Sequence, residues 1–152
     1  MRVFRLARKK YKIELSGKGA ARSGNRWNSK GTEIIYCAES RALAMAEVAV
    51  HLTLATLPSD YVMLEIEIPD TISKTTLKKS VLPLGWENFP HTTETQNIGD
   101  KFIWNANTCV LKVPSAVVPG DFNYLLNPSH AEFKQIKIVA QHDFPFDERL
   151  FN

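Results

Sequence analysis

The sequence predicts an α+β domain in which short strands form a mixed or antiparallel β core around one central buried helix. Two segments indicate this class. Apolar residues alternate over Tyr61 to Ile68 with the period of a half-buried strand. The segment from Arg41 to Leu57 is apolar on nearly all sides, as expected for a buried helix. Strands and helices do not alternate regularly along the chain, which argues against a doubly wound fold.

Other elements are predicted from short apolar runs and from the Gly, Pro and small polar residues that separate them. Ser40 is a natural N-cap for the long helix. Further strands are expected at Arg2 to Leu6, Glu33 to Ala38, Cys109 to Val113 and Ile136 to Gln141. The segment from Lys18 to Lys30 contains two glycines and small polar residues, which predicts a loop. Asn97 to Trp104 fits a short helix or an irregular turn, Asn123 to Pro128 is a punctuated stretch, and the tail from Asp143 to Phe151 is expected to fold back onto the body.

Length and composition fit a single domain over residues 1–152. Of the 152 residues, 44% are hydrophobic, which is sufficient for an independent core. Cys37 and Cys109 stand in apolar runs without metal-ligand spacing, which indicates buried thiols in a reducing compartment. No signal-peptide pattern or run of membrane length occurs, so we expect a soluble, cytoplasmic protein without membrane contact.

The net charge of +3 is concentrated in the first quarter of the chain. Such a basic segment fits an anionic small molecule, an acidic protein or nucleic acid. No motif for reading DNA or RNA is present, so we expect no direct nucleic-acid binding. The nucleic-acid alternative would require steeply salt-dependent binding.

Glu47 is the first candidate for chemistry, because it stands among apolar residues of the long helix. An ionised carboxylate that is buried without a partner costs several kcal/mol. A functional role and a structural one remain open. In the structural alternative, Glu47 pairs with His51 four residues later, pairs with an arginine, or lies at an exposed edge.

Arg26 stands in the sequence Gly24-Asn25-Arg26-Trp27-Asn28, where glycine permits close backbone approach and a guanidinium can hold phosphate. The segment is not a Walker loop, and a solvated basic loop is an open alternative. Trp27 fits the core or a ligand platform equally well. Tyr36, in the middle of a strand, fits a buried structural tyrosine.

Ser115 follows Pro114 at a strand end, where a turn-capping role is common. Ser129 is a candidate cap in the turn that Asn127 begins. His51 and His130 lack the spacing and company of metal ligands, so no metal is expected. No Gly-x-Ser-x-Gly motif or Cys/His dyad supports a hydrolase triad.

Together these residues resemble the RES domain, a family of bacterial toxins paired with Xre-type antitoxins. The matching blocks are residues 19–28 with Gly31, Tyr36, Ser40, Leu43, Ala44, Glu47 and His51; Leu82, Pro83 and Trp86; Gly99, Asp100 and Trp104; residues 113–115; residues 123–128 with His130; and residues 146–151. They occur in the family's order and span almost the whole chain. Asn25 replaces the second glycine that often precedes the family's arginine, and asparagine tolerates unusual backbone angles.

The resemblance implies a fold related to ADP-ribosyltransferase toxins, an activity that consumes NAD, and no metal. It assigns the family's arginine, tyrosine and glutamate to Arg26, Tyr36 and Glu47. The family's serine would be Ser115, with Ser129 as an alternative. The ligand-binding set that we expect is Gly24, Arg26, Trp27, Tyr36, His51, Asn127 and Ser129.

Under this hypothesis Glu47 stabilises positive charge on the ribose as the nicotinamide–ribose bond breaks. Arg26 would hold the pyrophosphate, Tyr36 would stack on nicotinamide, and Ser115 would orient the ribose or the nicotinamide amide. We expect NAD degradation by hydrolysis or phosphorolysis, with ADP-ribosylation of a protein as the alternative. An inactive module that binds nucleotide or antitoxin is a hypothesis of another class. The expected partner is an Xre-type helix-turn-helix antitoxin, and homo- and hetero-oligomers both remain open.

Overall fold

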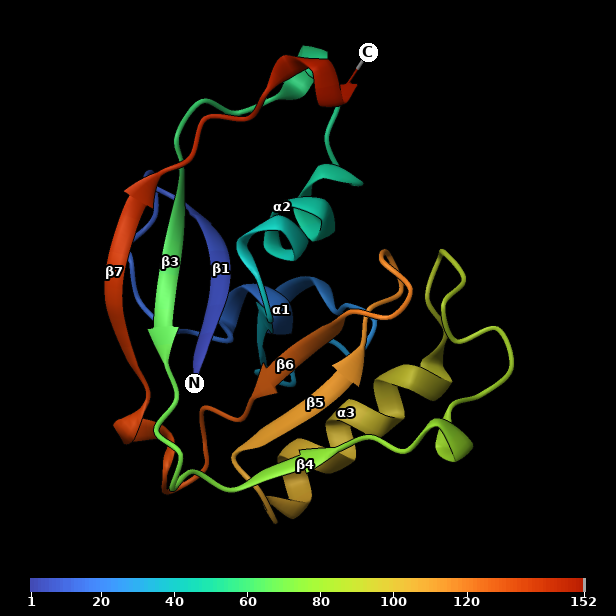
Figure 1. Ribbon diagram of the computed structural model, residues 1–152. Coiled ribbons are helices and arrows are strands. Elements are labelled where there is room, and N and C mark those ends of the chain that lie inside the picture. Colours follow the sequence, from blue (N-terminus) through green and yellow to red (C-terminus); the bar gives the residue numbers. More distant parts are fainter. Residues whose placement is uncertain (152) are drawn as a thin grey trace.

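The computed structural model describes residues 1–151, and within them a seven-stranded mixed sheet carries three α-helices (Figure 1). The strands are β1 (Arg2–Arg8), β2 (Ile35–Ala38), β3 (Tyr61–Glu67), β4 (Lys74–Thr76), β5 (Val110–Pro114), β6 (Phe122–Leu126) and β7 (Lys137–Asp143). The helices are α1 (Lys18–Ser23), α2 (Arg41–Ala49) and α3 (Thr93–Asn105). Their order in the sheet is β4-β5-β6-β2-β1-β3-β7, antiparallel except for β4 and β5. The predicted α+β class is confirmed.

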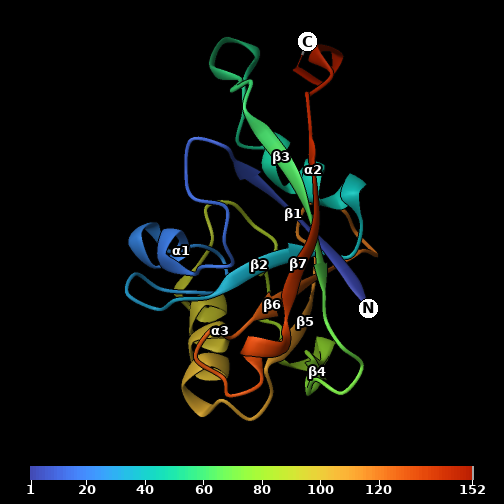
Figure 2. The ribbon, with the colours of Figure 1, turned by 90° about the vertical axis from the view of Figure 1, so that its left-hand side faces the viewer.

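The sheet consists of two halves that meet at a short junction. Strands β1, β3 and β7 pair along most of their length, and so do β5, β6 and β2. Between the halves, β1 and β2 share a single register pair, Phe4 with Ala38. Figure 2 shows that β2 and β1 are strongly rotated relative to each other at this point. The sheet therefore opens beside the junction, and α2 contacts both β1 and β2 there.

The periodic strand prediction is confirmed in β3. Val62, Leu64 and Ile66 are fully buried in the core cluster between the sheet halves. Met63 points to the other face and is also buried, because the tail after β7 covers it. Phe146 from that tail packs edge-to-face on Tyr61 with ring centroids 5.3 Å apart, so the tail does fold back onto the body.

The long apolar helix is shorter than predicted. It begins at Ser40, whose side chain accepts from Leu43 N–H as an N-cap, but it ends at Ala49. A 3₁₀ turn follows at Leu54–Thr56. Leu43 and Ala44 are buried, whereas Val50 and Leu54 are 58% and 46% exposed. The apolar pattern alone could not show that the second half of this segment leaves the sheet.

The structure differs from the sequence predictions at four places in the expected loops and turns. Residues 18–23 form helix α1, which the alanine pair favours and which ends at Gly24 with a φ of +70°. The punctuated stretch from Asn123 contains strand β6, whose last three residues are buried. Strand β4 was not expected in its polar segment. The predicted helix or turn near Asn97 is the thirteen-residue helix α3.

Helix α3 packs against one face of β5 and β6 and also supports the loop after α1. Its Ile98 and Phe102 join the apolar cluster that contains Leu125. At Gly99 the helix has no side chain, and a Cβ atom there would lie 1.6 Å from the carbonyl oxygen of Trp27. Glycine at this position therefore allows the loop that carries Arg26 to lie directly on α3.

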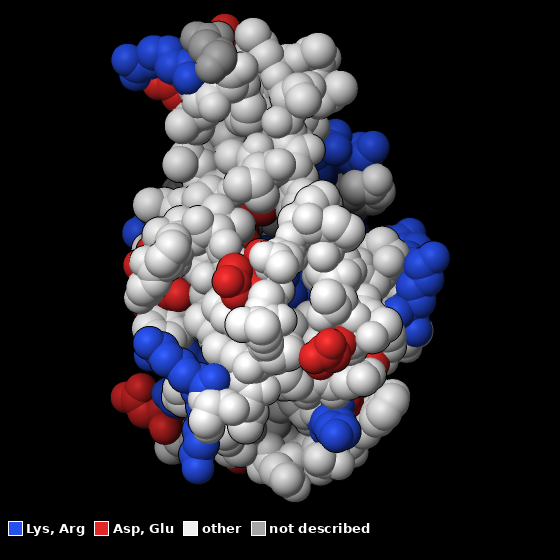
Figure 3. Space-filling model, turned by 90° about the vertical axis from the view of Figure 1, so that its right-hand side faces the viewer, with Lys and Arg blue, Asp and Glu red and all other residues white. Residues whose placement is uncertain are grey.

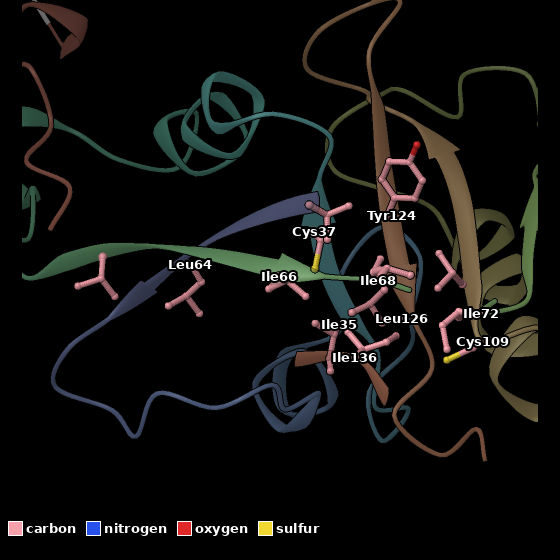
Figure 4. Close-up of a cluster of buried hydrophobic side chains, with 13 residues drawn as sticks. Ile35, Cys37, Leu64, Ile66, Ile68, Ile72, Cys109, Tyr124, Leu126 and Ile136 are labelled. Atoms are coloured by element: carbon pink, nitrogen blue, oxygen red, sulfur yellow. The ribbon is translucent and has the colours of Figure 1, made fainter. Parts of the chain in front are cut away.

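The core on the other face of β5 and β6 is apolar and contains both cysteines (Figure 4). Cys37 lies in β2 and Cys109 immediately precedes β5, and both are buried free thiols, as predicted. Within residues 1–151, no helix combines the length and the apolarity that crossing a membrane requires.

Replacing Gly99 should destabilise the fold strongly. The Cβ atom of Gly99→Ala meets backbone at 1.6 Å, so α3 and the loop must separate. We expect a loss of about 3 kcal/mol or more in the free energy of unfolding, measured by urea denaturation. Gly19→Ala, in α1 with nothing within 4 Å of its Cβ, is the control and should be neutral or slightly stabilising. Equal effects of the two substitutions would contradict this account of the packing.

Candidate functional site

A cavity of about 810 Å³ lies beside the junction of the two sheet halves. Its walls come from β1, β2, α2, the end of α1 with the loop after it, and residues 87–91. Figure 3 shows the face on which the loop of residues 82–92 lies; this face is hollowed in the middle, with a few acidic and basic atoms visible inside. The cavity has the volume usual for a small-molecule site.

Glu47 from α2 lines this cavity, and its carboxylate is held on one side only. Its Oε1 accepts hydrogen bonds from Ser115 Oγ and from Asn123 Nδ2, both at 2.7 Å. Among residues 1–151, Oε2 has no hydrogen-bond partner. Two donors at Oε1 fix the carboxylate plane and leave one oxygen for a ligand. No hydrogen bond or ion pair joins Glu47 to His51 in the described chain, so the structural pair considered from the sequence does not form.

Ser115 lies behind Glu47 and does not line the cavity. Its Oγ accepts from the backbone N–H groups of Val117 and Val118, each at 3.0 Å. The hydroxyl proton is therefore directed to Glu47. The side chain is 4% exposed. This geometry makes Ser115 a positioning residue for Glu47, whereas the sequence hypothesis had it touch the ligand.

Arg26 reaches the cavity from the loop after α1. Its Nη1 donates to the carbonyl oxygens of Trp86 at 2.6 Å and Asn88 at 3.0 Å, which belong to the segment 82–92. Burial lowers the pKa of Arg26, while Glu47, Tyr36 and Glu87 act in the opposite direction. A guanidinium remains protonated under such a shift. Within the described residues its Nε and Nη2 make no hydrogen bond, so donors remain for a ligand.

The loop that presents Arg26 is fixed by Tyr36 and Asn28. The Tyr36 hydroxyl accepts from Trp27 N–H at 3.0 Å and donates to Asn28 Oδ1 at 2.7 Å. Asn28 is fully buried, and its Nδ2 donates to the carbonyl oxygens of Ala20 and Thr32, among others. Burial raises the pKa of Tyr36, so its phenol stays protonated.

Tyr36 and Trp27 both line the cavity. Trp27 is nevertheless 2% exposed and packs in the apolar cluster beside Trp86, with ring centroids 6.1 Å apart, so it belongs to the core as well as to the cavity wall. Gly24 is not part of the cavity lining, although Asn25 and Arg26 beside it are.

Two cavity residues were not found from the sequence. Arg5 in β1 donates from Nη1 to the carbonyl oxygen of Tyr36 at 2.7 Å and places a second guanidinium in the cavity wall. His91 follows the exposed loop, and burial together with Arg26 lowers its pKa, so its imidazole is mainly neutral at pH 7. Arg5 belongs to a basic segment without a local motif, so only the pairing of β1 could place it.

His51 and Phe89 lie on opposite walls of the cavity, and their ring centroids are 6.2 Å apart. His51 is exposed and Phe89 is 76% exposed. These two rings form the mouth of the cavity.

The structure does not bring Asn127 and Ser129 to this cavity. Asn123 lies near the start of β6 and bonds to Glu47, whereas Asn127 follows the other end of the strand. There its buried Nδ2 donates to Ile103 O at 3.2 Å and its Oδ1 accepts from Ser129 N–H at 2.9 Å. Asn127 thus caps a turn, and the assignment of both residues to the ligand site, including Ser129 as the alternative serine, does not fit the structure.

Comparison with known proteins identifies the family to which the chain belongs. The RES domain model matches residues 2–147, which is nearly the whole chain. The chain belongs to the RES domain family. A Prs ADP-ribosylating toxin of a Sphingobium species is 38% identical over 139 residues, covering 90% of this chain and 86% of that protein. Toxin Res of Yersinia enterocolitica is 35% identical over 152 residues, covering 99% of each.

A solved structure supports the fold of this RES chain. The crystal structure of the Mycobacterium tuberculosis MbcT–MbcA toxin–antitoxin complex contains a chain that superposes with a TM-score of 0.74. The match covers 95% of this chain and 84% of that one at 22% identity. The recognition of a RES-domain toxin from sequence blocks is confirmed by the family match and by the relatives named Toxin Res.

Removing the Tyr36 hydroxyl should loosen the Arg26 loop. In Tyr36→Phe, Trp27 N–H and Asn28 Oδ1 lose their partner, which costs about 1–3 kcal/mol of unfolding free energy. Because the folded state holds the phenol proton, the tyrosine's stabilisation is complete below a pH of about 10 and declines above it. Urea unfolding across this range should show the difference between wild type and Tyr36→Phe shrinking as pH rises. A constant difference would contradict it, and Tyr11→Phe, at a 60% exposed tyrosine, serves as control.

Proposed function

We propose that this RES-domain toxin cleaves the nicotinamide–ribose bond of NAD and thereby degrades it. The main support for the proposal is the carboxylate of Glu47 in the cavity wall, in which Oε1 accepts two hydrogen bonds and Oε2 accepts none from the described residues. Such a group can stabilise the positive charge that develops on the ribose as nicotinamide leaves. Because Ser115 and Asn123 already hold Oε1, the free Oε2 needs no reorganisation to face that charge.

The positively and the negatively charged side chains of the cavity suit different parts of the NAD molecule. Arg5 and Arg26 supply two guanidinium groups, and the pyrophosphate of NAD carries two negative charges. Glu47 supplies negative charge on α2, where the positively charged nicotinamide ribose would lie. The ring of Tyr36 between them offers a surface on which nicotinamide can stack.

The proposed reaction breaks the bond between ribose C1′ and the nicotinamide nitrogen, whose electron pair leaves with the neutral nicotinamide. Water then adds to C1′ and releases one proton, which gives ADP-ribose. In phosphorolysis, inorganic phosphate adds instead and gives ADP-ribose 1″-phosphate. Glu47 acts in the first step of both, so the acceptor does not change its role.

A second candidate function is transfer of ADP-ribose to a protein. The Sphingobium relative is named a Prs ADP-ribosylating toxin, and it shares 38% of its residues with this chain over the aligned region. The same bond of NAD would break, and a nucleophilic side chain of the target would replace water. Nicotinamide release that requires added target protein would favour this candidate.

The proposed partner is an antitoxin of the Xre helix-turn-helix type. The support for an antitoxin is that the structural neighbour is a toxin–antitoxin complex and that the relatives carry the name toxin. The Xre type rests on the family resemblance. Co-expression of the chain with such a protein should restore growth that the chain alone arrests.

Removing the Glu47 charge tests the proposed function. Glu47→Gln keeps the shape of the side chain, and its amide oxygen can still accept from Ser115 and Asn123, but the negative charge is lost. We expect nicotinamide release from NAD to fall roughly 10²–10³-fold, as when one stabilising group of a transition state is removed. The assay is run with and without phosphate, which separates phosphorolysis from hydrolysis. Glu94→Gln, exposed on α3 and outside the cavity, should retain wild-type activity; turnover that survives Glu47→Gln would sink the assignment.

Arg26 should act mainly in substrate binding. Arg26→Lys keeps the charge but loses the planar fork that can hold a phosphate group and loop carbonyls together. We expect KM for NAD to rise about tenfold or more while kcat changes less. Arg22→Lys, exposed on α1, is the matched control. A fall in kcat with unchanged KM would assign Arg26 to the chemical step instead.

A further inference from the structure

Three side chains with metal-binding atoms meet at the end of β5 and β6 that lies away from Glu47. A ligand atom from each of Cys109, His130 and Glu132 lies within 4.8 Å of the other two. Cys109 immediately precedes β5, and its carbonyl accepts from Asn127 N–H at 2.9 Å. His130 and Glu132 follow in the turn after β6. Strands β5 and β6 lie between Cys109 and His130 in the sequence, so the sequence alone does not show that the two side chains are close in space.

We propose that Cys109, His130 and Glu132 bind a zinc ion, with water as the fourth ligand. A thiolate, an imidazole and a carboxylate are the three ligand types that zinc uses in proteins. The site is distinct from the NAD cavity, because none of these residues lines it. The inference does not depend on the proposed activity.

Two of the three ligand groups are already oriented. Oε2 of Glu132 accepts from Ser73 N–H at 2.9 Å and from Ser73 Oγ at 2.6 Å, which leaves Oε1 without a partner among residues 1–151. Nδ1 of His130 accepts from Glu132 N–H at 3.1 Å, so this nitrogen carries no proton and its lone pair points into the turn. A zinc ion would take the place of that N–H. The two bonds from Ser73 to Glu132 would remain behind the ligand, and such bonds hold metal sites in shape.

The spacing of the groups is close to what zinc requires. Nδ1 of His130 lies 3.8 Å from Oε2 of Glu132. Bond lengths of about 2.0–2.3 Å in a tetrahedral site place neighbouring ligand atoms roughly 3.3–3.7 Å apart. The three ligand atoms lie within 4.8 Å of one another, so side-chain shifts of roughly 1 Å would bring them to the separation that zinc requires.

Solvent reaches the cluster from one side. Cys109 is fully buried at the edge of the apolar core, beside Ile72 in Figure 4. The side chains of His130 and Glu132 are 14% and 31% exposed. An ion can thus enter past Glu132 and meet the thiol at the bottom. It would join the start of β5, the segment at Ser73 and the turn after β6, so its role would be structural.

Cobalt(II) provides the direct test, because it occupies zinc sites and reports a thiolate ligand by a charge-transfer absorption band. The full-length protein is first stripped with a chelator and then titrated with cobalt, and zinc is added as competitor. We expect one cobalt per chain, the thiolate band, its loss on adding one equivalent of zinc, and a higher melting temperature with zinc. Absence of the band, or of one-to-one binding, would overturn the proposal.

The matched variants are Cys109→Ser and Cys37→Ser, which alter the two buried thiols in turn. Cys109→Ser should abolish the band and weaken zinc binding at least about a hundredfold, whereas Cys37→Ser should keep both. His130→Gln, at a partly exposed position, should weaken zinc binding without unfolding the chain and covers the case in which Cys109→Ser fails to fold. Unchanged zinc affinity in His130→Gln, or loss of the band in a folded Cys37→Ser protein, would refute the assignment.

Discussion

The buried hydrogen-bond network of Asn28 and Tyr36 is the constraint on which the cavity depends. Asn28 is completely removed from solvent, and every polar atom of its side chain is bonded. An unmade bond at such a site costs about 1–3 kcal/mol, so the loop has one low-energy arrangement. That arrangement places Arg26 in the cavity wall. It also places the Trp27 carbonyl on α3, where only Gly99 leaves room.

A second network on the opposite wall orders Glu47. Ser115 Oγ accepts from two backbone N–H groups and donates its own hydrogen bond to the carboxylate, and Asn123 adds a further donor. Both networks are attached to the half of the sheet formed by β5, β6 and β2, and both lie beside the junction where β1 and β2 share one register pair. The weak pairing at this point creates the space, and the rigid networks on either side define what can occupy it.

The sequence contained the strands and the charged residues of the site but not their connections. Alternation identified β3, and the cost of a carboxylate in an apolar helix singled out Glu47. Pattern alone could not show that Ser115 points to Glu47, 68 residues away, or that Arg5 lies beside Tyr36, because these contacts depend on strand pairing. The prediction that Asn127 belongs to the ligand site does not fit for the same reason. The five residues of β6 separate Asn127 from the Glu47 end of the strand, and in a sequence the polar end of a strand resembles a loop.

Arg26 is the one group that belongs both to the ordered wall and to the exposed loop of residues 82–92. Its Nη1 bonds two loop carbonyls, while Trp86 anchors the base of that loop on Trp27. Leu84 and Phe89 lie in the outer part of this loop. Leu84 is fully exposed and Phe89 is 76% exposed, so burial of these side chains contributes little to the stability of the loop. In the proposed complex Nε and Nη2 would donate to a phosphate while Nη1 keeps its bonds to the two loop carbonyls. Binding of the anion and the position of the loop are therefore linked through one side chain, and each must alter the free energy of the other.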